Sequence, residues 1–224
     1  MDNIKKKKIE ALLKKKLPKQ YPEISMIHFE MLKCYTNGCY VASLSIALMF
    51  LEMFLREMCM HEEIFIREKE EYLKNPTNFD PNVRFEIIEE VEKLYEDMGK
   101  SSTKEGGFSF FELLKKSKKY KLTNSEERQE LSEIYQKLRI PIQHGIFRRL
   151  IEQFSINQGV PVTRMNIKSG QIEQTELKST HKLLRFPAME KFCKEQSYYT
   201  ILEIDRFCRD KLEKNFKLFT SPSH

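Results

Sequence analysis

Apolar residues recur every three or four positions along most of this chain, which is the spacing of one face of an α-helix. In residues 5–17 this face is surrounded by lysines and consists of Ile9, Leu12, Leu13 and Leu17. Pro18 and Pro22 follow it, so we predict a short basic helix that ends near residue 17. A solvated surface helix is the favoured interpretation, and an RNA-binding or membrane-binding arm is the alternative.

The same spacing predicts further helices along the rest of the chain. They cover about 36–74, 83–98, 108–120, 124–139 and 198–216. Two prolines and several polar turn-formers in 75–82 separate the first of these from the second, and the polar linker 99–107 separates the second from the third.

Capping signals mark the starts of two of these helices. Ser109 with Glu112, and Asn124 with Glu127, have the spacing of a capping box, in which two side chains satisfy the first amides of a helix. Apolar and polar residues then alternate loosely around a Ser-Gly turn at about 157–180, which predicts a small β-hairpin. We therefore expect an all-α helical bundle with one hairpin insertion.

The predicted organisation is one main domain with two short appendages. Residues 1–24 form a basic N-terminal helix or arm, residues 25–215 form the helical domain with its insertion, and residues 216–224 form a C-terminal tail. An uncharged stretch at 34–51 contains several polar residues, so we expect a core helix there and no membrane span.

Charge and cysteine content narrow the functional classes. The 224-residue chain has 39 Lys and Arg against 33 Asp and Glu, and the resulting charge of +6 weakly favours partners that carry phosphates. Five cysteines without Cys-x-x-Cys spacing suggest neither a disulfide framework nor a zinc site, and the apolar core of a signal peptide does not follow the first charges. We expect a cytoplasmic protein without a cofactor or metal.

The stretch LRIPIQHG at 138–145 contains the candidate chemistry. Arg139 and His144 are five positions apart, so in a straight helix they would project about 140° away from each other. Pro141 lies between them and predicts that the helix from Asn124 ends or kinks here. A kink would turn both side chains toward one cleft, or each would reach a partner across a two-fold axis.

Arginine and histidine together support metal-independent cleavage of RNA. A histidine near neutrality can take the proton of a ribose 2′-hydroxyl, and an arginine can bind the phosphate with two hydrogen bonds as charge develops. The products would be a 2′,3′-cyclic phosphate and a 5′-hydroxyl. His144 as a hydrogen-bonded structural histidine, and Arg139 as an ion-pair residue, are the competing interpretations.

The arrangement of these helices around Arg139 and His144 resembles the HEPN superfamily (higher eukaryotes and prokaryotes nucleotide-binding). Ribonucleases of this family have arginine, four to six residues and then histidine on a late helix, and the similarity spans most of residues 30–215. Active members usually have asparagine or another polar residue after the arginine, whereas this chain has Ile140.

The resemblance implies a set of roles and partners. It implies an endoribonuclease that acts as a toxin or phage-defence effector, pairs as a homodimer through the motif helices, binds RNA, and has a cognate antitoxin or regulatory protein. A non-catalytic module that binds nucleotide, RNA or a partner protein is the alternative, and an inhibitory or sensor subunit is a third hypothesis.

Other residues are expected to assist this site. Arg148 and Arg149 are either phosphate-binding residues or part of a solvated face. Gln143 and Glu52 are expected to support the site, although an i,i+4 ion pair with Arg56 is the favoured interpretation of Glu52.

Overall fold

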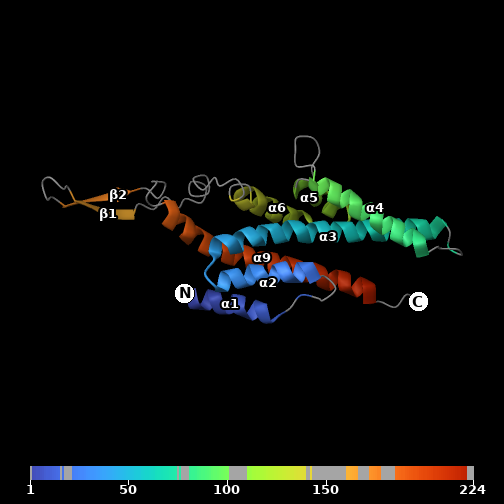
Figure 1. Ribbon diagram of the computed structural model, residues 1–224, viewed down its shortest axis with the longest axis horizontal. Coiled ribbons are helices and arrows are strands. Elements are labelled where there is room, and N and C mark those ends of the chain that lie inside the picture. The colour runs from blue at the N-terminus through green and yellow to red at the C-terminus, as the bar shows by residue number, and fades with distance from the viewer. Residues whose placement is uncertain are drawn as a thin grey trace. The chain divides into compact units, whose positions relative to one another are not determined.

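The computed structural model describes residues 2–15, 17, 22–74, 76, 81–100, 110–139, 142, 160–165, 172–177 and 185–220. Nearly all of these residues lie in helices, so the predicted helical class is confirmed (Figure 1). The chain divides into two compact units, residues 1–48 with 134–224 and residues 49–133.

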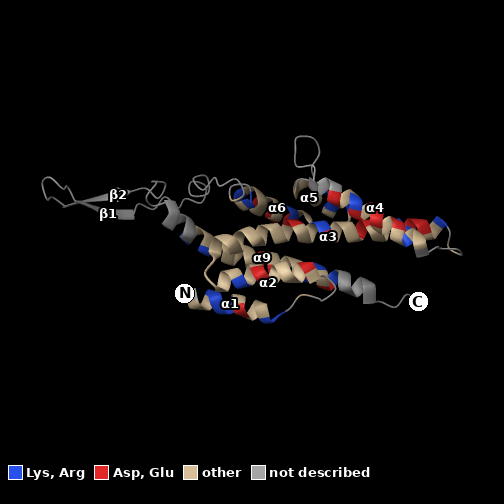
Figure 2. Ribbon diagram, viewed as in Figure 1, with Lys and Arg blue, Asp and Glu red and all other residues tan. Residues whose placement is uncertain are grey.

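The first unit is built on three helices that contact one another. They are α1 (Asp2–Lys14), α2 (Pro22–Thr36) and α9 (Arg185–Thr220), with the start of α3 (Tyr40–Lys74) in the same unit. α1 runs beside α2 (Figure 1) and buries Ile9 completely. The basic helix expected over 5–17 is therefore docked on the unit, and most of its lysines, which Figure 2 marks in blue, are exposed.

Contacts between α1 and α9 include a cation over two aromatic rings. The Lys5 ammonium lies 5.1 Å from the ring centre of Tyr198 and 5.0 Å from that of Tyr199. Such contacts contribute about 0.5–1 kcal/mol at exposed positions. They add to the burial of Ile9 in holding α1 on the unit.

The separate helix α2 corrects the sequence prediction, which began a long helix at about Thr36. Pro22 is the first residue of α2, where its missing amide hydrogen has no partner within a helix anyway. α2 then ends in a Schellman motif, with the Cys39 amide donating to the Cys34 carbonyl (2.9 Å) and the Gly38 amide to the Tyr35 carbonyl (3.0 Å). Gly38 has a φ of +81°, which side chains strongly disfavour.

This turn divides the uncharged stretch 34–51 between two helices. The stretch was expected to form one core helix, but it contains the end of α2, the turn at Gly38 and the start of α3. Ser43 links the two helices, because its hydroxyl donates to the Met31 carbonyl at 2.9 Å. Among the described helices, none is long and apolar enough to cross a membrane.

Two strands and a long last helix complete the first unit. β1 (Val160–Met165) and β2 (Ile172–Leu177) pair antiparallel, with Val160 opposite Leu177 and Met165 opposite Ile172. The last helix was predicted over 198–216, but α9 begins at Arg185 and continues to Thr220. Pro187 lies in its first turn, where proline is compatible with a helix.

The second unit consists of the remainder of α3 with α4 (Pro81–Lys100), α5 (Phe110–Lys119) and α6 (Ser125–Ile134). The buried face of α3 repeats at helical spacing through Phe54, Leu55, Met58 and Cys59. Acidic and basic residues are both frequent along α4 and the end of α3 (Figure 2). Ion pairs Arg84–Glu68 (2.9 Å) and Arg67–Glu90 (3.4 Å) join the two helices.

The turn between α5 and α6 is closed by local hydrogen bonds. The Leu122 amide donates to the Ser117 carbonyl at 2.8 Å, and Lys121 has a φ of 57°, so α5 ends in a left-handed residue that is not glycine. The capping box of Asn124 and Glu127 is confirmed, since each accepts from the backbone amide of the other at 2.9 and 2.8 Å. The other predicted box includes Ser109, which lies outside the described residues.

Candidate functional site

Arg139 is the last residue of a π-helical turn. α6 changes at Tyr135 into the turn η1 (Tyr135–Arg139), so the regular α-helix ends at Ile134, seven residues before the predicted break at Pro141. A proline at 141 removes an amide that the Lys137 carbonyl would accept, and its ring would clash with that carbonyl in an α-helix. The π-helical turn Tyr135–Arg139 precedes this proline, and such turns recur at functional sites.

Leu138 anchors the π-helical turn in the core of the first unit. Its side chain is buried with Leu44 and Leu48 of α3 and with Phe192 and Cys193 of α9. Tyr40, Ile134 and Ile142 pack against this cluster. Because Leu138 is fixed, the backbone of its half-buried neighbour Arg139 is fixed as well.

Five other residues of the predicted site lie outside the described part of the chain. They are His144, Gln143, Arg148, Arg149 and Ile140.

Glu52 lies on α3, where it forms a local ion pair. Its carboxylate is 3.6 Å from the guanidinium of Arg56, one helical turn later. The pair between these residues, which the i,i+4 spacing predicts, is confirmed.

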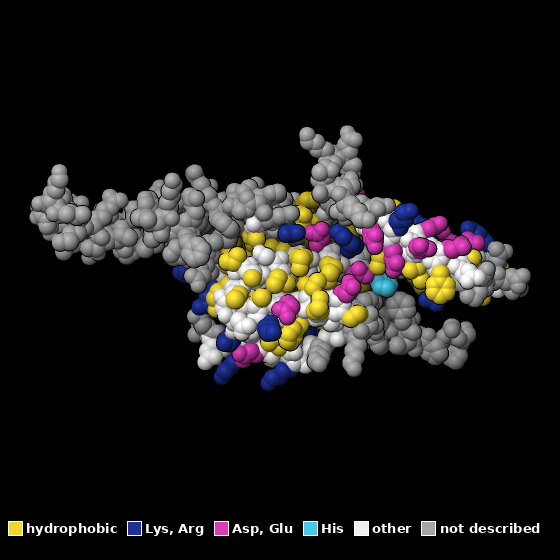
Figure 3. Space-filling model, in the orientation of Figure 1, with side chains coloured by type: hydrophobic (Ala, Val, Ile, Leu, Met, Phe, Trp, Pro, Cys, Tyr) yellow, Lys and Arg dark blue, Asp and Glu magenta, His cyan; other side chains and the backbone are white. Residues whose placement is uncertain are grey.

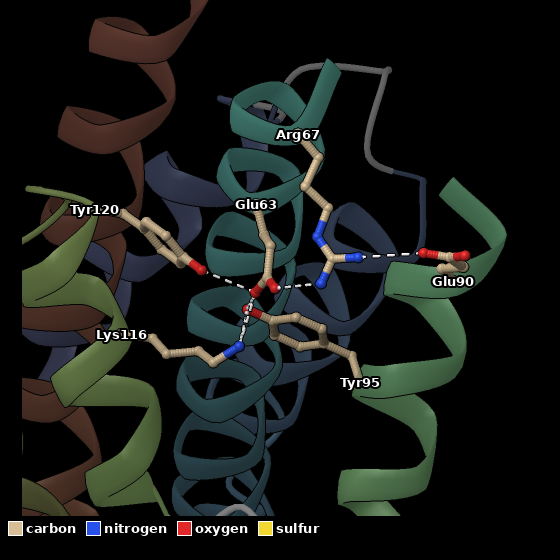
Figure 4. A network of polar contacts seen from close by, with 6 residues as sticks. All are labelled: Glu63, Arg67, Glu90, Tyr95, Lys116 and Tyr120. Carbon is tan, nitrogen blue, oxygen red and sulfur yellow. Dashed lines mark hydrogen bonds and ion pairs between the residues drawn. The ribbon is translucent and has the colours of Figure 1, made fainter. Parts of the chain in front are cut away.

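A polar network around Glu63 is the most extensive one described in the second unit (Figure 4). Glu63 Oε2 accepts hydrogen bonds from Lys116 Nζ (2.7 Å), Tyr120 Oη (2.8 Å) and Tyr95 Oη (3.1 Å), and Oε1 accepts from Arg67 (3.1 Å). Lys116 also lies over the Tyr95 ring, 4.5 Å from its centre. The network joins α3, α4, α5 and the turn after α5.

The ionisation of this network suits a structural role. Burial by itself would raise the pKa of Glu63, but the hydrogen bonds from Lys116, Tyr120 and Tyr95 and the Lys116 charge lower that pKa to about 2. Burial and the Glu63 carboxylate raise the pKa of Tyr120, and burial first and then nearby charges raise that of Tyr95. A carboxylate and two phenols whose pKa values lie so far from 7 are poor general acids or bases at pH 7.

A buried histidine and aspartate form the polar centre of the first unit. His28 Nε2 of α2 lies 2.7 Å from Asp205 Oδ1 of α9, and Arg209 Nε donates to both Asp205 oxygens at 3.1 and 2.9 Å. Arg209 also donates to the Lys15 carbonyl at 2.6 Å, just after α1. Burial would raise the pKa of Asp205, but the hydrogen bonds from His28 and Arg209 keep it below the usual value.

Sequence reasoning missed both networks, although each left a signal. Asp205 falls among Ile201, Ile204 and Cys208 on the buried face of α9, where a carboxylate requires a cationic or hydrogen-bonding partner. Glu63 likewise follows Cys59 by one turn on the buried face of α3. The identity of the partners could not be predicted, because they lie far away in the sequence.

The described part of the chain contains no cluster of metal ligands, and two of its buried cysteines are unreactive. In that part, no group of three or more His, Cys, Asp or Glu side chains is arranged to hold a metal ion. Burial raises the pKa of the Cys59 and Cys193 thiols to about 12, so both are protonated and unreactive at neutral pH.

The chain was also compared with known proteins. No protein-family model, curated protein or solved structure matches it.

Proposed function

We propose that this chain is a metal-independent endoribonuclease with Arg139 and His144 as its catalytic pair. The observation that carries the proposal is the π-helical turn that ends at Arg139 and is anchored through the buried Leu138. Interruptions of this kind require compensation by the surrounding core and occur frequently where function requires a particular side-chain direction.

In the proposed reaction, each residue has a separate role. His144 accepts the proton of the ribose 2′-hydroxyl as that oxygen attacks the adjacent phosphorus, and the bond to the 5′-oxygen breaks. Arg139 binds the phosphate oxygens as negative charge develops on them. The leaving 5′-oxygen takes up a proton from solvent water, and the products are a 2′,3′-cyclic phosphate and a 5′-hydroxyl. Arg148 and Arg149 would bind neighbouring phosphates, and Gln143 would support His144.

Glu52 is not assigned a catalytic role in this proposal. Its ion pair with Arg56 accounts for its charge, so Glu52→Gln should leave cleavage unchanged.

The same proposal includes a HEPN-like fold with a hairpin insertion and a role as a toxin or phage-defence effector. The helices that precede and follow Arg139 in the chain support the proposal of a helical fold of this kind, and the HEPN ribonucleases that the chain resembles act as homodimers, toxins or defence effectors. DNA should be inert, because the reaction requires a 2′-hydroxyl.

The decisive experiment is incubation of the purified full-length chain with total RNA in excess EDTA, followed by analysis of the product ends. Cleavage should survive chelation and fall about 10²- to 10⁴-fold in Arg139→Ala and in His144→Ala. Lys137→Ala, on the same π-helical turn, and His181→Ala are matched controls that should retain activity. Cleavage that requires magnesium, or that persists in both active-site variants, would refute the proposal.

A second candidate is a non-catalytic module that binds RNA or nucleotide, and Ile140 favours it. This apolar residue occupies the position after the arginine where active HEPN members usually have a polar side chain. Under this alternative, the wild-type chain binds RNA without cutting it, and expression of the chain in a bacterial host does not slow growth. Under the ribonuclease proposal, expression slows growth and His144→Ala restores it.

A further inference from the structure

A cavity of about 580 Å³ opens between α1 and α2. The described residues that line it are mainly apolar and come from the two helices, with Leu17 after α1: Leu12, Leu13, Leu17, Met26, Phe29 and Leu32. Met26 and Phe29 are 61% and 46% exposed, and apolar side chains gather on the surface over α2 (Figure 3). The volume lies within the range of sites that enclose small molecules, which is about 300–1,000 Å³.

One wall of the cavity includes a buried histidine that is held by a hydrogen bond. His28, which is 3% exposed, lines the cavity and is held by Asp205 on α9. Arg209 binds the same carboxylate and the carbonyl of Lys15, another residue that lines the cavity. A continuous series of hydrogen bonds thus connects the wall at His28 with the backbone of Lys15.

The charge on the described lining of the cavity comes from one lysine. Among the lining residues that the structure describes, Lys15 is the one with a permanent charge, and none is acidic. Lys14 lies beside it, and the guanidinium of Arg209 lies 2.6 Å from the Lys15 carbonyl. An apolar enclosure with a cation beside it complements a molecule that has an apolar body and one anionic group.

We propose that this cavity binds an apolar carboxylate, with the hydrocarbon portion between α1 and α2 and the carboxylate near Lys15. This binding site is separate from Arg139 and His144, so it does not depend on the ribonuclease proposal. A cationic amphiphile would be repelled by Lys15, and a neutral one would lack the ion pair.

Dodecanoate, used below its critical micelle concentration, is the probe for this site. Titration calorimetry with the full-length chain should give saturable binding, while dodecanol should bind several-fold more weakly and dodecyltrimethylammonium weaker still. In carbon-13 methyl-methionine NMR spectra, the Met26 signal, assigned with Met26→Leu, should shift on addition of dodecanoate.

Substitutions in and beside the cavity test whether dodecanoate binds there. Lys15→Met should weaken dodecanoate binding about three- to fivefold, as expected for a solvent-exposed ion pair, whereas Lys14→Met on the neighbouring position should not. Leu13→Trp fills the cavity and should weaken binding at least tenfold, with far-UV circular dichroism as the check on folding. Absence of both the heat and the Met26 shift, equal binding of dodecanol, or equal losses in the two lysine variants would overturn the proposal.

Discussion

His28 Nε2 and Asp205 Oδ1 lie 2.7 Å apart although 177 positions separate the two residues in the chain. Both side chains are almost fully buried, and the contact joins α2 to α9. Since Arg209 binds the same carboxylate, Asp205 satisfies two donors from inside the unit.

Replacing Asp205 with alanine should therefore destabilise the protein severely. The variant leaves His28 and Arg209 without their shared acceptor, and breaking a buried pair in this way costs about 3–5 kcal/mol. Urea denaturation followed by far-UV circular dichroism measures the loss in the free energy of unfolding. Asp205→Asn keeps one acceptor oxygen and should lose less, so equal losses in the two variants would contradict this account.

Replacing either of two adjacent glutamates on α3 with glutamine should change the free energy of unfolding in different ways. Glu63→Gln removes the charge that accepts from Lys116 and the tyrosines, and we expect a loss of about 1–3 kcal/mol at pH 7. Burial raises the pKa of Glu62, so its ionised form is disfavoured in the folded protein and Glu62→Gln should be neutral or stabilising at pH 7.

The pH dependence of the Glu63 variant follows from the direction of the shift. The folded pKa of about 2 lies below the usual 4.5, so the contribution of Glu63 is present above pH 4.5 and is lost as the pH falls toward 2. The stability difference between wild type and Glu63→Gln should therefore shrink over that interval. A difference that stays constant from pH 7 to pH 2.5 would show that the charge of Glu63 does not contribute.

The left-handed residue at the end of α5 offers a stabilising substitution. Lys121 has a φ of 57°, a conformation that costs a residue with a side chain about 1–2 kcal/mol and costs glycine little. Lys121→Gly should raise the free energy of unfolding by about 1 kcal/mol. Lys118→Gly, inside α5, serves as the control and should lower it by a similar amount. Destabilisation by both changes would count against this assignment of the turn.

Assembly provides a test of the proposed active site. If the chain is a homodimer whose sites combine Arg139 of one protomer with His144 of the other, a heterodimer of Arg139→Ala and His144→Ala chains contains one intact pair. Co-expressed, differently tagged chains should then cleave RNA better than either parent homodimer. A monomer by light scattering would exclude this arrangement, and a dimer without rescue would indicate sites contained within one chain.

Local patterns predicted most of the helices but only part of their boundaries. Apolar spacing located α1 and α3 through α6, and the box at Asn124 and Glu127 located the start of α6. α2 was missed because Pro22 was interpreted as a stop, whereas proline at a first helical position is a common start. The π-helical turn also escaped prediction, since apolar spacing does not distinguish it from an α-helix over five residues.

The candidate site was predictable only as a motif. Arg139 and Pro141 indicate an interruption of the helix, but the anchoring of Leu138 against α3 and α9 depends on residues far away in the sequence. The same reason explains the missed networks of His28 and Glu63, whose partners lie on other helices.

The separation of His28 and Asp205 also has a kinetic consequence. The turn from Ser117 to Glu127 is closed by hydrogen bonds between residues at most six positions apart, including Ser117 with Thr123 at 2.7 Å. Forming such contacts sacrifices little chain entropy, whereas joining His28 to Asp205 closes a loop of 177 positions. The turn before α6 should therefore form early during folding, and the junction of α2 with α9 should form later, because it requires α9 to be present.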